Sequence, residues 1–207
     1  MFSRLPDMLS RTARKAETRV RILTAARHLF EADGFDATNI RRIADAAGVA
    51  TGTVLFHFTD KLDLLHAALF EDLEAVLHDV TQAPPGRSLR QWLSRLVDRV
   101  LSHYEARPAL SRVLLRESLL SGPPWAERFA GQMTRLHAAV AARSSVALER
   151  GEVRPDFQPS LFAGAFVSYY LFGLLAWAQG SHPAPRALVE HLADHHLAGY
   201  RAVKGRR

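Results

Sequence analysis

The chain of 207 residues contains no cysteine. It therefore forms no disulfide bond and offers no thiolate ligand to a metal ion. The amino terminus shows no basic start followed by an apolar stretch, which is the pattern of a secretory signal, so we expect a cytoplasmic protein. A nucleophile elbow, a phosphate-binding glycine loop and a His-Glu zinc motif are also missing. These absences argue against an enzyme, and we expect neither a cofactor nor a metal.

Charged residues are missing between Asp156 and Arg186, and the stretch from Leu161 to Trp177 is mostly apolar. That stretch is nearly long enough to cross a bilayer. Polar residues inside it, such as Ser168, and the lack of a second such segment favour the alternative, a buried central helix. We therefore expect no association with a membrane.

The segment from Thr38 to Lys61 reads TNIRRIADAAGVATGTVLFHFTDK and is the most informative in the chain. Apolar residues recur in it at three- and four-residue steps, which predicts a short amphipathic helix with Arg41 and Arg42 on its polar face. Thr38 is the predicted amino-terminal cap, and Gly48 is predicted to end the helix in a left-handed conformation. A second short helix after this sharp turn gives a helix-turn-helix.

The second helix, predicted over residues 51–56, begins with small polar side chains. In a helix-turn-helix such residues meet base edges in the major groove of DNA. His57 and Lys61 follow as cationic groups suited to phosphates. The predicted DNA-binding residues are Thr38, Arg41, Arg42, Thr51, Gly52, Thr53, Phe56, His57 and Lys61.

Residues 19–69 resemble the amino-terminal domain of the TetR family of transcriptional regulators. The resemblance rests on a leading helix and on three short motifs, Gly34-Phe35, Ala47-Gly48-Val49 and Gly52-Thr53-Val54, followed by His57-Phe58 and Lys61. It implies that Thr51, Thr53, His57 and Lys61 touch DNA. The chain departs from the family pattern at Leu55 and Phe56, which lack the hydroxyl of the usual tyrosine, and at Ala50, where a serine cap is usual.

The formal net charge of +6 favours a polyanionic partner, and residues 1–61 carry 10 Lys and Arg against 7 Asp and Glu. Residues 1–16 are predicted to form a flexible basic arm before a DNA-binding domain over residues 17–63. Such an arm can follow the DNA backbone, but a solvated tail without a partner explains the same residues. The basic run consists of Arg4, Arg11, Arg14, Lys15, Arg19 and Arg21.

Residues 64–207 show helical spacing throughout, with Gly or Pro at each break, and neither strand patterns nor repeats. The predicted fold is all-α: an amino-terminal three-helix helix-turn-helix domain and a carboxyl-terminal helical domain for ligand binding and dimerisation. Because a palindrome doubles the contacts of one recognition helix, we expect a homodimer, formed through the last two helices.

Aromatic and soft side chains of the second domain are candidates to line a pocket for a small apolar or aromatic effector. Simple core packing is the competing interpretation for each of them. Binding of the effector would release a palindromic operator, which makes the protein a ligand-relieved repressor. The candidate lining residues are Trp92, Tyr104, Phe129, Met133, Phe166, Tyr169 and Tyr170.

Two alternatives remain open at this stage. His191 and His195 have a spacing that suits a metal ion on one helix face, but the sequence identifies no third ligand. Ala50, Leu55 and Phe56 allow a different function, a small-molecule-binding or interaction protein whose helix-turn-helix no longer reads DNA specifically.

Overall fold

The computed structural model describes residues 5–82, 86, 88–120 and 122–201. These residues form nine α-helices and no strand, apart from an isolated bridge between Val153 and Arg201, so the predicted all-α fold is confirmed. The chain divides into two compact units at Glu71/Asp72. The helices are α1 (Leu5–Asp33), α2 (Ile40–Ala47), α3 (Thr51–His57), α4 (Lys61–Gln82), α5 (Leu89–Glu105), α6 (Pro108–Leu120), α7 (Trp125–Glu149), α8 (Pro159–Ala178) and α9 (Pro185–Ala198).

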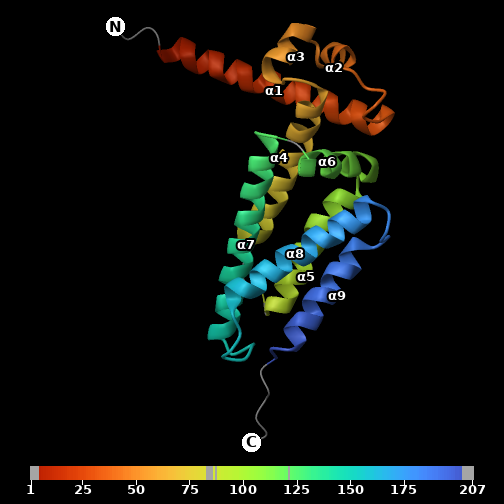
Figure 1. The fold of residues 1–207 in the computed structure, drawn as a ribbon. Coiled ribbons are helices and arrows are strands. Elements are labelled where there is room, and N and C mark those ends of the chain that lie inside the picture. The colour runs from red at the N-terminus through yellow and green to blue at the C-terminus, as the bar shows by residue number, and fades with distance from the viewer. Residues whose placement is uncertain (1–4, 83–85, 87, 121, 202–207) are drawn as a thin grey trace, which may run out of the picture. The chain divides into compact units, whose positions relative to one another are not determined.

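The first unit is built on a small apolar core. Phe30 from α1, Ile43 from α2 and Val54 from α3 are each at most 1% exposed, and Phe58 closes the core from the start of the next loop. Figure 1 shows α2 and α3 beside the second half of α1, while the amino-terminal turns of α1 extend beyond them. These contacts hold the helix-turn-helix on one side of α1.

The segment expected to be a flexible basic arm, residues 1–16, is helical from Leu5 onward. Its first four residues lie outside the described part of the chain. Residues 11–16 are exposed, so packing does not explain the helix there. Arginine, lysine and alanine are good helix formers, and they extend α1 because no glycine or proline interrupts the sequence after Pro6. The basic side chains are therefore carried on a helix.

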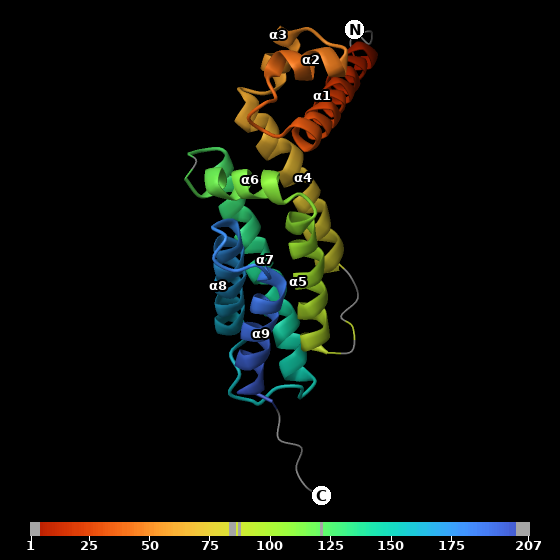
Figure 2. The ribbon, with the colours of Figure 1, turned by 90° about the vertical axis from the view of Figure 1, so that its right-hand side faces the viewer.

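The second unit is a bundle in which α5, α7, α8 and α9 run alongside one another and α6 lies across them (Figure 2). Its core contains Trp92, Phe162, Phe166 and Leu174, each at most 2% exposed. Arg186 of α9 ties this helix to α5, since its guanidinium donates to three side chains of α5. The acceptors are Asp98 at 2.6 Å, Ser102 at 2.7 Å and Glu105 at 2.8 Å. The predicted break at Ala83-Pro84-Pro85 lies outside the described residues.

The apolar segment expected to be a buried central helix is α8, and it buries one face only. That face packs on α7 and α9, and a close approach to α9 depends on Gly173, because a Cβ there would lie 2.5 Å from a methyl group of Val189. On the opposite face Leu161 and Phe172 are 65% and 56% exposed. By length and composition, α8 is the one helix among the described residues that could span a bilayer.

Candidate nucleic-acid interface

Helix α2 is capped by Asn39 before its first residue and by Gly48 after its last. Asn39 is extended, with φ −133° and ψ 163°, and its side-chain oxygen accepts a hydrogen bond from the Arg42 backbone N–H at 3.0 Å. Gly48 has φ +66°, the left-handed conformation that favours glycine. The chain turns there, and the N–H of Val49 donates back to the Ala44 carbonyl at 3.0 Å. The predicted turn is present.

The prediction that Thr38 caps α2 was wrong, because Asn39 caps it. Thr38 is 1% exposed, and its hydroxyl donates toward the carbonyls of Gly34 at 2.8 Å and Leu29 at 3.2 Å. The hydroxyl satisfies carbonyls at the carboxyl end of α1, and this role holds the α1–α2 loop in place. A buried hydroxyl that faces the protein cannot reach a phosphate, so Thr38 does not belong to the DNA-facing surface.

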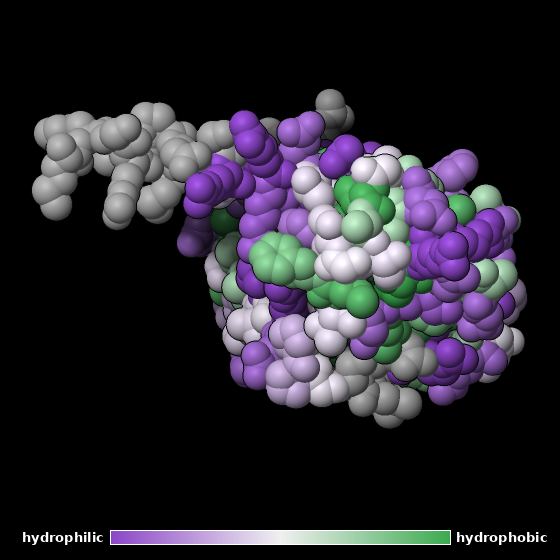
Figure 3. Space-filling model, turned by 90° about the horizontal axis from the view of Figure 1, so that it is seen from above, coloured by the Kyte–Doolittle hydropathy of each residue, from purple (hydrophilic) through white to green (hydrophobic). Residues whose placement is uncertain are grey.

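Helix α3 presents its small polar residues to solvent. Val54 is fully buried and anchors the helix, whereas Thr51 and Gly52 are exposed and Thr53 is half-buried. Ala50 stands at the cap position in an extended conformation and makes no side-chain capping bond. Leu55 is 51% and Phe56 is 71% exposed. Figure 3, a space-filling view from above, shows hydrophobic areas bordered by hydrophilic side chains.

Two cations of α1 lie beside α3. The Lys15 ammonium is 5.0 Å from the centroid of the Phe56 ring, and the Arg19 guanidinium is 5.3 Å from that of Phe58. Arg19 is also paired with Glu71 at 2.6 Å. Sequence reasoning placed both residues in the basic run but did not single them out. The available signal was their spacing of four, which puts them on one face of a helix.

His57 ends α3 between two aromatic rings, 5.4 Å from Phe56 and 6.2 Å from Phe58 between centroids. Burial, and then the positive charges of Lys15 and Arg19, hold the pKa of His57 below its ordinary value. A neutral imidazole results at physiological pH, and its ring N–H can still donate a hydrogen bond to a phosphate oxygen. The surrounding cations make this corner of the unit electropositive.

The remaining predicted cations differ in how they are held. Arg41 is exposed on α2, and Arg42 is paired with Asp33 at 2.7 Å. The Lys61 ammonium donates to the carbonyl of Phe35 at 2.7 Å and lies 4.3 Å from the centroid of that ring. Lys61 thus fastens the start of α4 to the α1–α2 loop, where the sequence suggested a group turned toward phosphates.

The residues predicted to line a ligand pocket fall into two groups. Trp92, Tyr104, Phe166 and Tyr170 are each at most 2% exposed, and burial raises the pKa of Tyr104 to about 12. These four side chains therefore sit in the bundle core as neutral groups. Three others are half-buried, namely Phe129, Met133 and Tyr169, the last with its hydroxyl 3.0 Å from His196 Nδ1.

Residues 22–68 match the family model described as bacterial regulatory proteins, tetR family. The regulator UidR of Escherichia coli K12 is 24% identical over 159 residues, which cover 77% of this chain and 80% of UidR. The repressor KstR of Rhodococcus jostii is 28% identical over 171 residues, 83% of this chain and 77% of KstR. The structure of Thermus thermophilus FadR with lauroyl-CoA is 24% identical, has a TM-score of 0.62, and covers 91% of this chain and 99% of FadR.

The family match contains the helix-turn-helix, and the fold likeness extends over both units. The hydroxyls of α3 and the cations beside it are groups that protein–DNA contacts use. Over residues 22–68 the chain is therefore similar to the bacterial regulatory proteins of the tetR family.

Proposed function

We propose that this chain is a sequence-specific DNA-binding repressor that acts as a homodimer and leaves its operator when a small ligand binds. The observation that carries the proposal is the exposed amino-terminal half of α3, with the α1 cations Lys15 and Arg19 beside it. Thr51, Gly52 and Thr53 would read base edges, while the cations and Arg41 would contact phosphates.

A second copy of the chain is the proposed partner of α8 and α9. The solvent-facing stripe of α8 contains no charged residue, and its large side chains Leu161 and Phe172 are more than half exposed. An uncharged stripe of this kind favours association with another protein surface. A two-fold pair of chains presents two copies of α3, which suits a palindromic operator.

The carboxyl-terminal unit is proposed to hold a small apolar or aromatic effector. The FadR structure carries lauroyl-CoA, and that protein has the same fold. Since the four buried aromatic residues already fill the core, we assign them to packing of the bundle and not to contact with the effector. Phe129, Met133 and Tyr169 are half-buried, so these three of the seven predicted residues keep some exposed surface. Linkage then requires that effector and operator weaken each other's binding by the same factor.

We assign DNA binding to residues 17–63 and effector binding and dimerisation to residues 64–207. The protein is proposed to be cytoplasmic and not an enzyme. Residues 5–16 join the DNA-binding part as a helical extension. Support for this division comes from the family match, which ends at residue 68.

A second candidate function is a ligand-binding or interaction protein that does not read DNA specifically. It is favoured by Ala50, which gives α3 no capping bond, and by the exposed hydrocarbon surfaces of Leu55 and Phe56. These residues replace polar groups that would assist the contact with DNA in the family pattern.

Selection of duplexes from a random library by the purified protein, followed by sequencing, separates the two candidates. A repressor enriches one palindrome, and Thr53→Ala changes the enriched sequence or lowers its enrichment. Ala130→Ser, on an exposed part of α7, serves as the matched control and leaves the enrichment unchanged. Failure to enrich any sequence with the wild-type protein would support the second candidate.

A further inference from the structure

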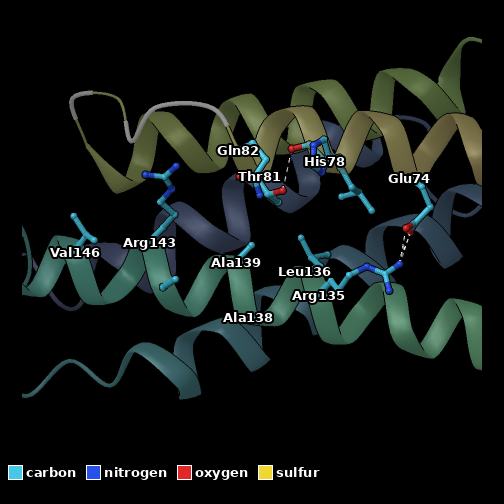
Figure 4. A pocket seen from close by; sticks show the side chains of 12 residues that line it. Glu74, His78, Thr81, Gln82, Arg135, Leu136, Ala138, Ala139, Arg143 and Val146 are labelled. Carbon is cyan, nitrogen blue, oxygen red and sulfur yellow. Dashed lines mark hydrogen bonds and ion pairs between the residues drawn. The ribbon is translucent and has the colours of Figure 1, made fainter.

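The carboxyl-terminal unit contains a cavity of about 650 Å³ between α4 and α7 (Figure 4). None of the seven residues expected to bind ligand lines it. A cavity of this size is within the range that drug-sized molecules occupy in proteins. Its lining residues are Glu74, Leu77, His78, Thr81, Gln82, Arg135, Leu136, Ala138, Ala139, Ala142, Arg143 and Val146.

The α7 wall of the cavity is apolar along its middle, whereas the α4 wall carries His78 and Thr81 as well as Leu77. Ala138, Ala139 and Ala142 form the α7 side, and Leu77 faces them from α4. Alanine leaves space that a longer side chain would fill, so the two helices enclose a groove along this stretch. A ligand lying there would gain about 25 cal/mol for each Å² of apolar surface removed from water.

The charges of the cavity lie toward its two ends (Figure 4). At one end Glu74 accepts hydrogen bonds from Arg135, at 2.6 Å to each carboxylate oxygen, and from Gln132 at 2.9 Å. The carboxylate is therefore already matched by a cation. At the other end Arg143 stands 5.6 Å from the centroid of the Trp92 ring. Two arginines and one glutamate give the lining a formal charge of +1.

We propose that this cavity binds an amphipathic organic anion, with its apolar body along the alanine face of α7 and its acidic group at Arg143. The inference rests on the proposed function, since it names the site and the chemical class of the effector. A guanidinium pairs well with a carboxylate, sulfonate or phosphate. Helix α4 supplies one wall of the cavity and begins at Lys61, so ligand contacts at residues 74–82 act on a helix that also belongs to the first unit.

Two fluorescent probes with the same ring skeleton test the charge requirement. The anion 8-anilinonaphthalene-1-sulfonate and the neutral N-phenyl-1-naphthylamine are titrated into the full-length protein. We expect one saturable site for the anion. Arg143→Gln should weaken binding of the anion about tenfold and binding of the neutral probe by less than about twofold. Arg128→Gln is the matched control, because Arg128 also lies on α7 over a tryptophan, at 4.6 Å from Trp125, but does not line the cavity.

A second variant tests the location independently of charge. Ala139→Trp fills the middle of the cavity and should abolish binding of both probes, while circular dichroism confirms that the helices and the melting temperature are retained. Equal weakening of both probes by Arg143→Gln, or anion binding that survives Ala139→Trp in a folded protein, would overturn the proposal.

Operator binding is measured separately on the same samples. Saturable, Arg143-dependent anion binding in a protein that enriches no palindrome would leave the cavity assignment standing and would remove the repressor function. Palindrome enrichment without anion binding at the cavity would leave the repressor function standing and would remove the cavity assignment.

Discussion

The ammonium group of Lys15 lies 5.0 Å from the centroid of the Phe56 ring, so a cation of α1 covers a side chain of α3 that is 71% exposed. An exposed cation–π contact of this kind contributes about 0.5–1 kcal/mol. Its larger consequence is positional, because it keeps a positive charge at the edge of the proposed DNA-reading helix. The exposed hydrocarbon of Phe56 thereby gains a role that the sequence did not suggest.

Replacement of Lys15 by alanine should weaken binding to the selected palindrome and to random duplexes alike. Loss of one phosphate contact lowers the slope of log affinity against log salt by about 1. Fluorescence anisotropy at several salt concentrations measures that slope. Arg21→Ala removes the same charge from the opposite side of α1 and should leave the slope near its wild-type value, since Arg21 makes no contact in this proposal. Equal slopes for wild type and Lys15→Ala would remove Lys15 from the interface.

The protonation of His57 gives a second prediction. Burial, followed by the charges of Lys15 and Arg19, lowers its pKa from the ordinary value of 6.5, and removal of Lys15 relieves part of this effect. NMR titration should therefore find the pKa of His57 below 6.5 in the wild type, and higher in Lys15→Ala but not in Arg21→Ala. A wild-type pKa at or above 6.5 would contradict the geometry described for α3.

The same depressed pKa sets the sign of a stability effect. The unfolded chain binds the proton more tightly than the folded chain, so ΔG of unfolding falls as the proton concentration rises. The contribution of His57 is complete above about pH 6.5 and is lost as the pH falls through that value toward the folded-state pKa. His57→Gln should reduce this part of the pH dependence of urea unfolding.

The helix-turn-helix could be predicted in detail because its signals are local. Gly48 ends α2 in the left-handed conformation that the sequence suggested, and the apolar spacing placed Ile43 and Ala47 on the buried face. The cap of α2 could not be predicted in the same way. Thr38 and Asn39 are both good cap residues, and the choice depends on whether a hydroxyl is needed by the carbonyls of α1, which is a tertiary contact.

The residues predicted to bind a ligand show the limit of sequence-based prediction. Large aromatic side chains such as Trp92 and Phe166 attract attention in a sequence, but their size is also the reason that they fill the core. The cavity between α4 and α7 is lined by residues such as Ala139 and Ala142, whose small size leaves space and gives no sequence signal. The role of Lys61 also gives no sequence signal, because its contact with Phe35 joins residues that are far apart in the chain.

Two glycines of the helix-turn-helix should respond to alanine with opposite signs. A Cβ meets nothing within 4 Å at either Gly48 or Gly52, so backbone conformation alone decides the effect. Gly48→Ala forces a side chain into the left-handed region and should cost about 1–2 kcal/mol. Gly52→Ala, inside α3, should stabilise the fold by up to about 1 kcal/mol. Urea unfolding followed by circular dichroism measures both changes, and a destabilised Gly52→Ala would contradict the helical assignment of residues 51–57.

The oligomeric state should depend on the exposed face of α8. Phe172→Glu places a charge on the uncharged stripe, where Phe172 is 56% exposed, and should convert the dimer to a monomer without loss of helix. Light scattering after size-exclusion chromatography gives the mass of each species. Ala130→Glu adds the same charge at an exposed position of α7 and should remain dimeric. A dimer that persists in Phe172→Glu would place the interface elsewhere.

The most direct test of the central claim is the affinity of the wild-type protein for its selected palindrome, compared with a shuffled duplex of the same composition at one physiological salt concentration. A dimeric repressor should prefer the palindrome by a factor on the order of a thousand or more and bind it as two chains per duplex. Thr53→Ala should reduce that ratio. Lys15→Ala should lower the affinities for the palindrome and for the shuffled duplex alike and leave their ratio nearly unchanged. Equal affinities of the wild-type protein for the two duplexes would contradict the account.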